Sequence, residues 1–266
     1  MLSVDRKTVQ AMASILARVL ILDPAPASAR LLGELLQSIG LGQSWVAAST
    51  EQALSLAGAA DPLLIFTEFA GDNADGVRFT RRLRRGTLAC RKAPVIMVTA
   101  QATPASIWAA RDAGVHEFLR KPYTIKDLVR RIEAVATKPR NWVEAVDYVG
   151  PDRRRFNSGE YRGARRRRVD GAEDPAEARI VQALKIVSAA LGAIEFDRAQ
   201  AFRALNAQAA ELQKAGATAR RSALVSAAHG LQQRLIQIGS AGELTREVVE
   251  MEALALLTYL PADEAA

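Results

Sequence analysis

Cysteine and histidine are scarce in this sequence. Its 266 residues include one cysteine, Cys90, and two histidines, His116 and His229. A single cysteine excludes an internal disulfide framework and a metal site with several cysteine ligands. The two histidines and the cysteine lie far apart in the sequence, so no nucleophilic or zinc-binding set is visible. A chain without disulfides is typical of a reducing compartment, and the sequence therefore predicts a cytoplasmic protein.

Aromatic residues and long apolar runs are scarce as well. Aromatic residues make up 5% of the chain, and no apolar stretch reaches the length of a transmembrane helix. Near the N-terminus, the apolar run 12–22 is interrupted by Arg18 and leads into a strand-like segment, so we expect no signal peptide. The chain is 49% hydrophobic, which is enough for a sizeable core, and we expect no membrane insertion.

Between residues 18 and 137, apolar runs alternate with amphipathic stretches. The runs predict five strands, namely 19–22, 45–48, 63–67, 95–99 and 117–119. The stretches predict helices over 26–39, 51–57, 77–85, 104–113 and 125–136. Strands that do not alternate polar and apolar residues, separated by helices, indicate a parallel sheet covered on both faces. The fold predicted for 18–137 is therefore α/β, a doubly wound, five-stranded, flavodoxin-like sheet with its functional edge at the carboxyl ends of the strands.

Four short motifs make this region resemble the response-regulator receiver domain of the CheY type. They are LILDPAP after the first strand, FTEFAGDNADG after the third, VIMVTA on the fourth and FLRKP on the fifth. The resemblance implies a paired-acid magnesium site after the first strand and a phosphoacceptor aspartate at the end of the third. It also assigns the family's switch hydroxyl to Thr99, its lysine to Lys121 and its switch aromatic to Phe118.

Two of these positions depart from the family pattern. The acidic pair falls on Asp23 and Pro24, and the phosphoacceptor position falls on Glu68. Magnesium prefers several oxygen ligands in octahedral geometry, and with one carboxylate absent we expect no magnesium and no other cofactor. Glutamate is not expected to form the acyl phosphate on this scaffold, so the sequence predicts a pseudo-receiver. Glu68 is then either a mimic of the phosphorylated state that reaches Thr99 or Lys121, or a plain loss of function.

A basic stretch follows the receiver-like region. Residues 148–168 contain an aromatic-x-Gly unit with arginines at its sixth to eighth positions, and this unit occurs twice, starting at Tyr148 and at Tyr161. Between Pro151 and Arg168, eight arginines stand against two acids, which accounts for six of the chain's seven net positive charges. Glycine, proline and like charges argue against independent folding here, and the charge points to an anionic ligand.

Three partners suit such a stretch, and a solubilising basic linker is the simpler alternative. Arginines can neutralise the phosphates of a nucleic acid or contact an acidic membrane surface, although no adjacent anchor supports the membrane. Arginine can also bind guanine, pair with phosphate and stack on a base, and tyrosine can stack as well. Asp152 could accept from a guanine edge, which is of no use on a phosphate backbone.

The duplicated unit behind a degenerate receiver resembles the CheY-like cyclic-di-GMP effectors of the Cle type. In that family an arginine-rich tail binds the cyclic dinucleotide. Carried over, the resemblance implies the binding residues Tyr148, Asp152, Arg153, Arg154, Arg155, Tyr161, Arg165, Arg166, Arg167 and Arg168. The second copy departs from the first, because Ala164 and Arg165 replace Pro151 and Asp152.

The C-terminal third predicts helices over 176–191, 196–214, 218–238 and 244–260, with Asp174-Pro175 at the first start. Four helices with short joints indicate a small antiparallel bundle. His229 is followed by Leu231, as in histidine phosphotransfer domains, but Gln232 and Gln233 replace the family's lysine and glycine. An ordinary surface or interface histidine is the alternative to a phosphohistidine.

The domain prediction is an extension over 1–17, a pseudo-receiver over 18–137, an arginine-rich linker and ligand segment over 138–172, and an α-helical domain over 173–266. The predicted function is that of a non-enzymatic effector, in which cyclic-di-GMP binding is relayed to a protein partner. By resemblance, that partner belongs to flagellar motor, adhesion or cell-cycle machinery. The alternatives are a nucleic-acid-associated regulator and a phosphorelay protein acting through His229.

Overall fold

The computed structural model describes residues 6–69, 74–153 and 175–261, with the backbone alone at residues 6 and 7. It divides into two compact units. The first contains residues 1–143 and 148–161, and the second contains residues 144–147 and 162–266. Within the described residues, no helix is both long and apolar enough to cross a membrane.

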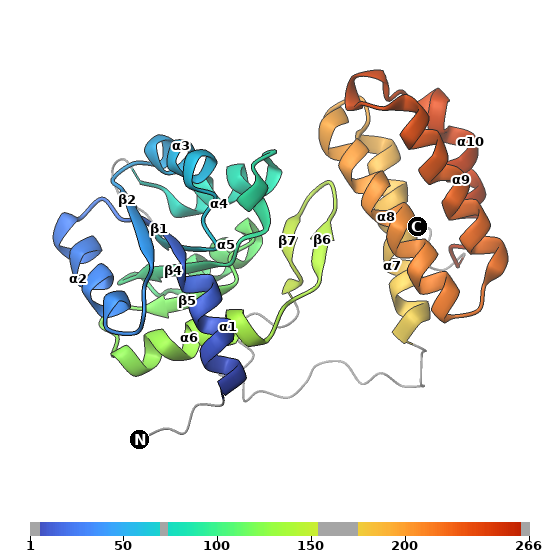
Figure 1. Cartoon of the computed structure of the whole chain (residues 1–266). Helices are drawn as coiled ribbons and strands as arrows, with labels where there is room; N and C mark the ends of the chain where they lie inside the picture. The colour runs from blue at the N-terminus through green and yellow to red at the C-terminus, as the bar shows by residue number, and fades with distance from the viewer. Residues whose placement is uncertain (1–5, 70–73, 154–174, 262–266) are drawn as a thin grey trace. The chain divides into compact units, whose positions relative to one another are not determined.

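The first unit is built on a five-stranded parallel sheet with strand order β2-β1-β3-β4-β5 (Figure 1). Its strands are β1 (Arg18–Leu22), β2 (Gln43–Ala47), β3 (Leu64–Glu68), β4 (Val95–Thr99) and β5 (Glu117–Arg120). This is the doubly wound order, so the predicted fold class is confirmed. Each strand lies within a residue or two of its predicted position, because a continuous apolar run leaves little freedom in placing a buried strand.

Helices cover both faces of this sheet. They are α1 (Arg6–Leu16), α2 (Pro26–Gln37), α3 (Thr50–Ala60), α4 (Gly76–Arg85), α5 (Pro104–Ala113) and α6 (Ile125–Thr137), with the short 3₁₀ helix η1 (Ala89–Lys92). Side chains at the starts of four helices accept backbone N–H groups: Ser49 from Gln52 at α3, Asp75 from Arg78, Thr103 from Ser106, and Thr124 from Asp127. Such caps satisfy donors that the helix itself leaves unpaired, which is why α3, α4, α5 and α6 begin where they do.

The core of the first unit lies in two layers, one on each face of the sheet. On β1, Leu20 and Leu22 pack with α3, α4 and α5, whereas Val19 and Ile21 pack with α2 and α6. Alternate residues of a strand point to opposite faces, so a run that is apolar at every position serves both layers. The helix α1 was not predicted; its Met12 and Leu16 extend the second layer against α6.

A two-stranded sheet of β6 (Trp142–Glu144) and β7 (Val149–Pro151) corrects the predicted boundary at residue 137. The sequence places residues 138–172 in one linker, but Trp142 and residues 148–153 belong to the first unit. The Trp142 ring lies 5.4 Å from the guanidinium carbon of Arg84, and Arg91 and Lys92 also lie over it. The receiver unit therefore extends about fifteen residues beyond its predicted end.

Arg84 is the residue that contacts both the Trp142 ring of β6 and the loops of the receiver unit. Only 1% of this arginine is exposed, although the sequence groups it with the other arginines of α4. Its guanidinium donates to the carbonyl oxygens of Gly114, Arg91 and Ala93 and contacts Nδ1 of His116. Burial lowers the pKa of Arg84 to about 9. A buried cation is costly unless its donors are satisfied, and carbonyl oxygens provide that satisfaction here.

Two glycines, Gly150 on β7 and Gly114 directly after α5, allow the backbone to approach closely at this point. A Cβ on Gly150 would lie 2.8 Å from Cα of Gly114, and a Cβ on Gly114 would lie 2.8 Å from the carbonyl oxygen of Val149. Tyr148 is 4% exposed, and its hydroxyl donates to the carbonyl oxygen of Pro151 at 2.5 Å. The first Tyr-x-Gly-Pro sequence is therefore a structural element that holds the chain against the receiver unit.

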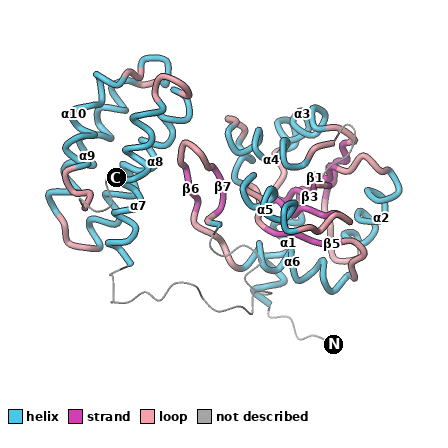
Figure 2. The backbone as a smooth tube through the Cα atoms, turned by 180° about the vertical axis from the view of Figure 1, so that it is seen from behind, coloured by secondary structure: helices cyan, strands magenta, loops and turns pink. Residues whose placement is uncertain are grey.

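In the second unit, the described residues 175–261 form helices and the short turns that join them (Figure 2). Its helices are α7 (Pro175–Ala193), α8 (Arg198–Thr218), α9 (Ser222–Ile238) and α10 (Arg246–Leu257), with the 3₁₀ helix η3 (Ala241–Glu243). Consecutive helices contact each other, and α10 returns to α7, so the predicted four-helix arrangement is confirmed. Fully buried Leu184, Leu212, Leu231 and Val249 represent the four helices in its core.

Residues 144–147 contribute polar contacts to this second unit. Glu144 is 4% exposed, and its carbonyl oxygen accepts from Nε2 of Gln208. Nε2 of Gln200 lies 2.9 Å from the carbonyl oxygen of Ala145. Both glutamines are buried, so these bonds satisfy amide groups that the bundle would otherwise bury without partners.

Candidate functional site

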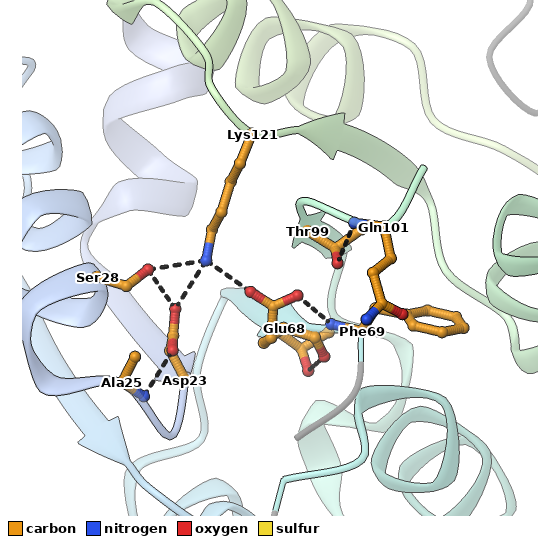
Figure 3. A network of polar contacts seen from close by, with 9 residues as sticks. Asp23, Ala25, Ser28, Glu68, Phe69, Thr99, Gln101 and Lys121 are labelled. Carbon is orange, nitrogen blue, oxygen red and sulfur yellow. Dashed lines mark hydrogen bonds and ion pairs between the residues drawn. The ribbon is translucent and has the colours of Figure 1, made fainter. Parts of the chain in front are cut away.

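The polar residues predicted for a receiver site gather at the carboxyl edge of the sheet (Figure 3). Asp23 directly follows β1, Glu68 ends β3, Thr99 ends β4 and Lys121 directly follows β5. The carboxyl ends of parallel strands meet at one edge, which is why residues almost a hundred positions apart become neighbours. Ser28, on the first turn of α2, joins them and was not predicted.

The ammonium group of Lys121 bonds to both acidic side chains at this edge of the sheet, Asp23 and Glu68. Its Nζ lies 2.6 Å from Oε2 of Glu68, 3.3 Å from Oδ2 of Asp23 and 2.8 Å from Oγ of Ser28. The side chains are partly shielded from water, with 13% of Glu68, 8% of Asp23 and 25% of Lys121 exposed. Burial alone lowers the pKa of Lys121, but the hydrogen bond and charge of Glu68, with those of Asp23, outweigh it and raise that pKa.

The carboxylate oxygens have other donors as well. Oδ1 of Asp23 accepts from the backbone N–H of Ala25, and Oδ2 accepts from the hydroxyl of Ser28 at 2.6 Å. Oε1 of Glu68 accepts from the backbone N–H of Phe69 at 2.9 Å. With the lysine on the remaining oxygen, all four carboxylate oxygens accept at least one hydrogen bond.

Glu68 is also held through its backbone. Gly76 begins α4 against the end of β3, and a Cβ on Gly76 would collide with the carbonyl oxygen of Glu68 and the hydroxyl of Thr67. The backbone N–H of Gly76 donates to the carbonyl oxygen of Phe69. A glycine is therefore required where the loop closes back onto the strand, and the glutamate is positioned by backbone and side chain together.

Of the two partners proposed for Glu68, the structure brings Lys121 to it. The hydroxyl of Thr99 instead accepts from the backbone N–H of Gln101 at 3.2 Å, and Thr99 is only 2% exposed. Phe118 is 4% exposed and packs in the layer that faces α3, α4 and α5. In this conformation, therefore, Glu68 is paired with the lysine, while the two switch positions are packed inside the unit.

A second site begins where the arginine stretch leaves the receiver unit. Nη1 of Arg153 lies 3.1 Å from Oδ1 of Asp112 on α5, and its guanidinium carbon lies 4.4 Å from the centre of the Tyr148 ring. Burial raises the pKa of Tyr148 to about 12. The ring of Tyr148, which the resemblance assigns to the ligand, lies inside the unit with Arg153 on one face, so in this structure it orients that arginine.

The structure describes only the first part of the predicted ligand set. Asp152 is half-buried, and its backbone N–H donates to the carbonyl oxygen of Asn141 at 2.8 Å. The other expected binding residues lie outside the described residues, namely Arg154, Arg155, Tyr161, Arg165, Arg166, Arg167 and Arg168. Asp112 was missed, because an acid in the last turn of a predicted helix carries no sequence signal of its role.

His229 lies on the exposed surface of α9, and Leu231, two residues later, is fully buried. Gln232, at one of the positions that depart from the phosphotransfer pattern, accepts from Nε2 of Gln213 on α8. Elsewhere, in the ranges 6–69, 74–153 and 175–261, no three His, Cys, Asp or Glu side chains gather to hold a metal ion.

The doubly wound sheet, with acids and a lysine at its carboxyl edge, defines a domain of the receiver class. Residues 19–133 match the family model of the response regulator receiver domain. The probable chemotaxis protein CheY of Rhizobium etli is 31% identical over 118 residues, which cover 91% of that protein and 44% of this chain. The chain belongs to the response regulator receiver family, and thus to the proteins of two-component signalling.

Two further similarities cover the same region. The KDP operon transcriptional regulatory protein KdpE of Escherichia coli is 30% identical over 117 residues, and the match spans 50% of that protein and 44% of this chain. The solved structure of the Vibrio cholerae chemotaxis protein CheY4 is 22% identical with a TM-score of 0.41, covering 98% of that chain and 45% of this one.

Proposed function

We propose that this chain is a non-enzymatic signalling effector, in which the receiver unit takes no phosphoryl group and the arginine stretch binds cyclic-di-GMP. In this proposal the bound dinucleotide is the input and a protein partner receives the output. The observation that carries the first part is the pairing of Lys121 with Glu68 and Asp23. The cyclic-di-GMP part is supported by Arg153, whose side chain is 41% exposed and is held at the surface by Asp112.

The donor set of the receiver site does not fit magnesium. Magnesium requires near-octahedral oxygen ligands, and members of the family use an acidic pair after the first strand. Here one position of that pair is Pro24, and both remaining carboxylates accept from the Lys121 ammonium. An ammonium between two carboxylates already supplies the positive charge that a metal would bring.

Glu68 is proposed to act as a fixed partner of Lys121 and not as a phosphoacceptor. Its carboxylate reaches one methylene further than an aspartate would, and both of its oxygens accept hydrogen bonds. The pair reproduces the contact between the lysine and a negative group, but Thr99 stays bonded to Gln101. This supports a site held in one state, in which phosphorylation no longer shifts the balance between two.

Testing this part requires a small-molecule phosphodonor such as acetyl phosphate with magnesium. We expect no incorporated phosphate in the native protein. The double variant Glu68→Asp/Pro24→Asp rebuilds the family's acids, and we expect it to gain magnesium-dependent label. Glu68→Asp alone, which leaves Pro24 in place, is the matched control. Stoichiometric labelling of the native protein at Glu68 would overturn the proposal.

The cyclic-di-GMP part rests on the chemistry of arginine and on the way its first member is presented. Guanidinium groups pair with phosphate and can bond to the guanine edge, which a lysine-rich stretch does less well. The side chains of Arg153 and Arg111 both bond to Asp112, and about two fifths of each is exposed. Arg154 and Arg155 follow directly in the sequence. The ligand would thus meet a ready pair of cations at the start of the stretch.

The partner is proposed by class only. One relative is a chemotaxis protein by name, which supports flagellar motor machinery as the target. Another is a transcriptional regulatory protein by name, which supports the competing function on nucleic acid phosphates. The two functions differ in ligand size and in the number of phosphates engaged.

Isothermal titration of the full chain with cyclic-di-GMP is the decisive experiment. We expect saturable heat in the low micromolar range or below, and a loss of binding of about 10-fold or more in Arg153→Ala/Arg154→Ala. Arg30→Ala/Arg81→Ala removes the same charge at exposed positions of α2 and α4 and should leave affinity unchanged. No heat from the native protein, or equal losses in both double variants, would contradict a specific dinucleotide site.

A further inference from the structure

One face of α5 carries a large exposed aromatic side chain beside ionic groups. Trp108 is 61% exposed, and Arg111 and Asp112 follow it at the third and fourth positions along the helix. Residues at these spacings lie on one helix face, roughly 5–6 Å apart at their Cβ atoms. The indole of Trp108 therefore stands one helical turn from the carboxylate that holds Arg153.

Trp108 differs from the other two tryptophans of the chain. The ring of Trp142 lies under Arg84, Arg91 and Lys92, and Trp45 packs against the core layer near α3. Among the residues that the structure describes, none makes a hydrogen bond, a ring contact or a cation–π contact with the side chain of Trp108. It is also the most exposed large apolar side chain in the described part of the first unit.

The charged groups beside Trp108 form a compact set. Oδ1 of Asp112 lies 3.1 Å from Nη1 of Arg153 and 3.1 Å from Nε of Arg111. Burial tends to raise the pKa of Asp112, but the hydrogen bonds and charges of Arg111 and Arg153 outweigh it and lower that pKa. The Asp112 carboxylate thus bonds to the guanidinium groups of both Arg111 and Arg153. The three side chains together carry one net positive charge beside the exposed indole of Trp108.

These groups together suit a ligand that is both planar and anionic. An indole offers a stacking surface to any nucleobase, and the two arginines can pair with phosphate oxygens. A simple polyanion site needs cations but gains nothing from an exposed tryptophan. Exposed tryptophan costs free energy in water, whereas covering it with a base recovers that cost.

We propose that Trp108 is a further ligand-binding residue, whose indole stacks on one guanine of cyclic-di-GMP while Arg111 and Arg153 contact the phosphates. This inference rests on the proposed function and deepens it. It moves the binding site from the arginine stretch alone to a surface shared by that stretch and α5. The receiver unit then contributes to recognition, so the fold has a role in binding beyond displaying the arginines.

The test compares Trp108→Ala, Trp108→Phe and Leu31→Ala in the full chain, with cyclic-di-GMP as the calorimetric titrant. Stacking on an aromatic side chain is worth enough that we expect Trp108→Ala to weaken binding about 10-fold or more. Trp108→Phe keeps a smaller ring and should lose less. Leu31, which is 55% exposed on α2, is the matched control, and its truncation should not change affinity.

Tryptophan fluorescence gives a readout that a merely structural role would not change. Ligand should quench the emission of the native protein and of Leu31→Ala, and Trp108→Phe should abolish that quenching. Thermal unfolding of the three variants should match that of the native protein, since both side chains are largely exposed.

The possible failures are distinguishable. If the native protein binds cyclic-di-GMP and Trp108→Ala binds equally well, the inference falls and the proposed function stands. If the native protein gives no heat with cyclic-di-GMP, both fall. If Trp108→Ala instead loses affinity for a single-stranded oligonucleotide and the native protein ignores the dinucleotide, the face is a nucleic-acid surface and the inference is overturned.

Discussion

At the scale of single residues, burial decides which charged groups act and which only hold the structure. Arg84 and Arg81 lie three positions apart on α4, yet one is fully buried under carbonyl oxygens and the other is exposed. Tyr148 starts the first copy of the arginine unit, and its ring is buried beneath the guanidinium group of Arg153. Identical residue types therefore carry different roles, which follow from their neighbours.

His116 provides a prediction at this scale. It is buried, and its Nδ1 accepts from the backbone N–H of Val95 at 3.2 Å and contacts Nη2 of Arg84. Burial, followed by the charges of Arg84 and Arg140, holds the pKa of His116 well below its usual value of 6.5. Below about pH 6.5, His116 therefore binds a proton in the unfolded chain but stays neutral in the folded chain. The contribution of neutral His116 to the free energy of unfolding is complete above pH 6.5 and is progressively lost as the pH falls below that value.

The loss approaches about 1.4 kcal/mol for each pH unit below 6.5 from this one group. Urea unfolding followed by tryptophan emission measures it, since all three tryptophans lie in the first unit. His116→Gln should be less stable at pH 7.5 and should show a shallower fall between pH 6.5 and 5.5. His229→Gln changes an exposed residue of the second unit and serves as the control. An unaltered slope in His116→Gln would show that another group titrates.

At the scale of elements, the strands and helices of the receiver unit were predictable and its attachments were not. Continuous apolar runs locate β1, β3 and β4, because a strand covered on both faces needs apolar residues at every position. The sheet of β6 and β7 has strands of three residues each and includes Pro151. Such short segments have no readable period, and they are stable only because Trp142 and Tyr148 dock onto the unit.

Gly150 provides a prediction for this attachment. In Gly150→Ala the new Cβ would lie 2.7 Å from the Tyr148 hydroxyl and 2.8 Å from Cα of Gly114. Overpacking of this kind costs roughly 1–3 kcal/mol, so we expect the first unit to unfold at a lower urea concentration. The emission of Trp142 should move to longer wavelength at that lower concentration, because the ring becomes exposed to water. The measurement is again urea unfolding followed by tryptophan emission.

Gly33→Ala is the matched control for that substitution. Gly33 lies inside α2, and no atom lies within 4 Å of a Cβ built there. Alanine in a helix interior is favoured over glycine by roughly 0.5–1 kcal/mol, so this variant should be unchanged or more stable. Equal behaviour of the two alanine variants would mean that β7 does not pack against Gly114 in solution.

At the scale of the whole molecule, charge is concentrated and not spread. The chain carries a net charge of +7, and residues 154–168 alone carry six of these charges. Residues 1–153 have 20 basic and 15 acidic residues, and residues 169–266 have 9 basic and 13 acidic ones, so the net charge is positive in the first part and negative in the last. An anion is therefore attracted to the arginine stretch and to the residues before it, and not to the C-terminal part.

Salt dependence provides the prediction at this scale. A protein that engages six to ten phosphates of a duplex loses about 10³ to 10⁵ in affinity between 50 and 200 mM salt. Cyclic-di-GMP has two phosphates, so we expect its affinity to fall by no more than about 10-fold over the same range. Titrations at both salt concentrations, repeated with Asp152→Ala, check this. If the affinity for a nucleic acid falls steeply with salt and is the same in Asp152→Ala, the result favours the nucleic-acid function.

The sequence by itself determined the sheet, the four-helix arrangement and the receiver site. Each of these depends on local pattern or on residues at strand ends, which the parallel topology brings to one edge. Only the tertiary structure decided that Lys121 bridges Glu68 and Asp23, that Arg84 is buried, and that Tyr148 supports Arg153. These outcomes depend on contacts between distant segments, and burial alters the energy of a charge or a ring in ways that residue type does not reveal.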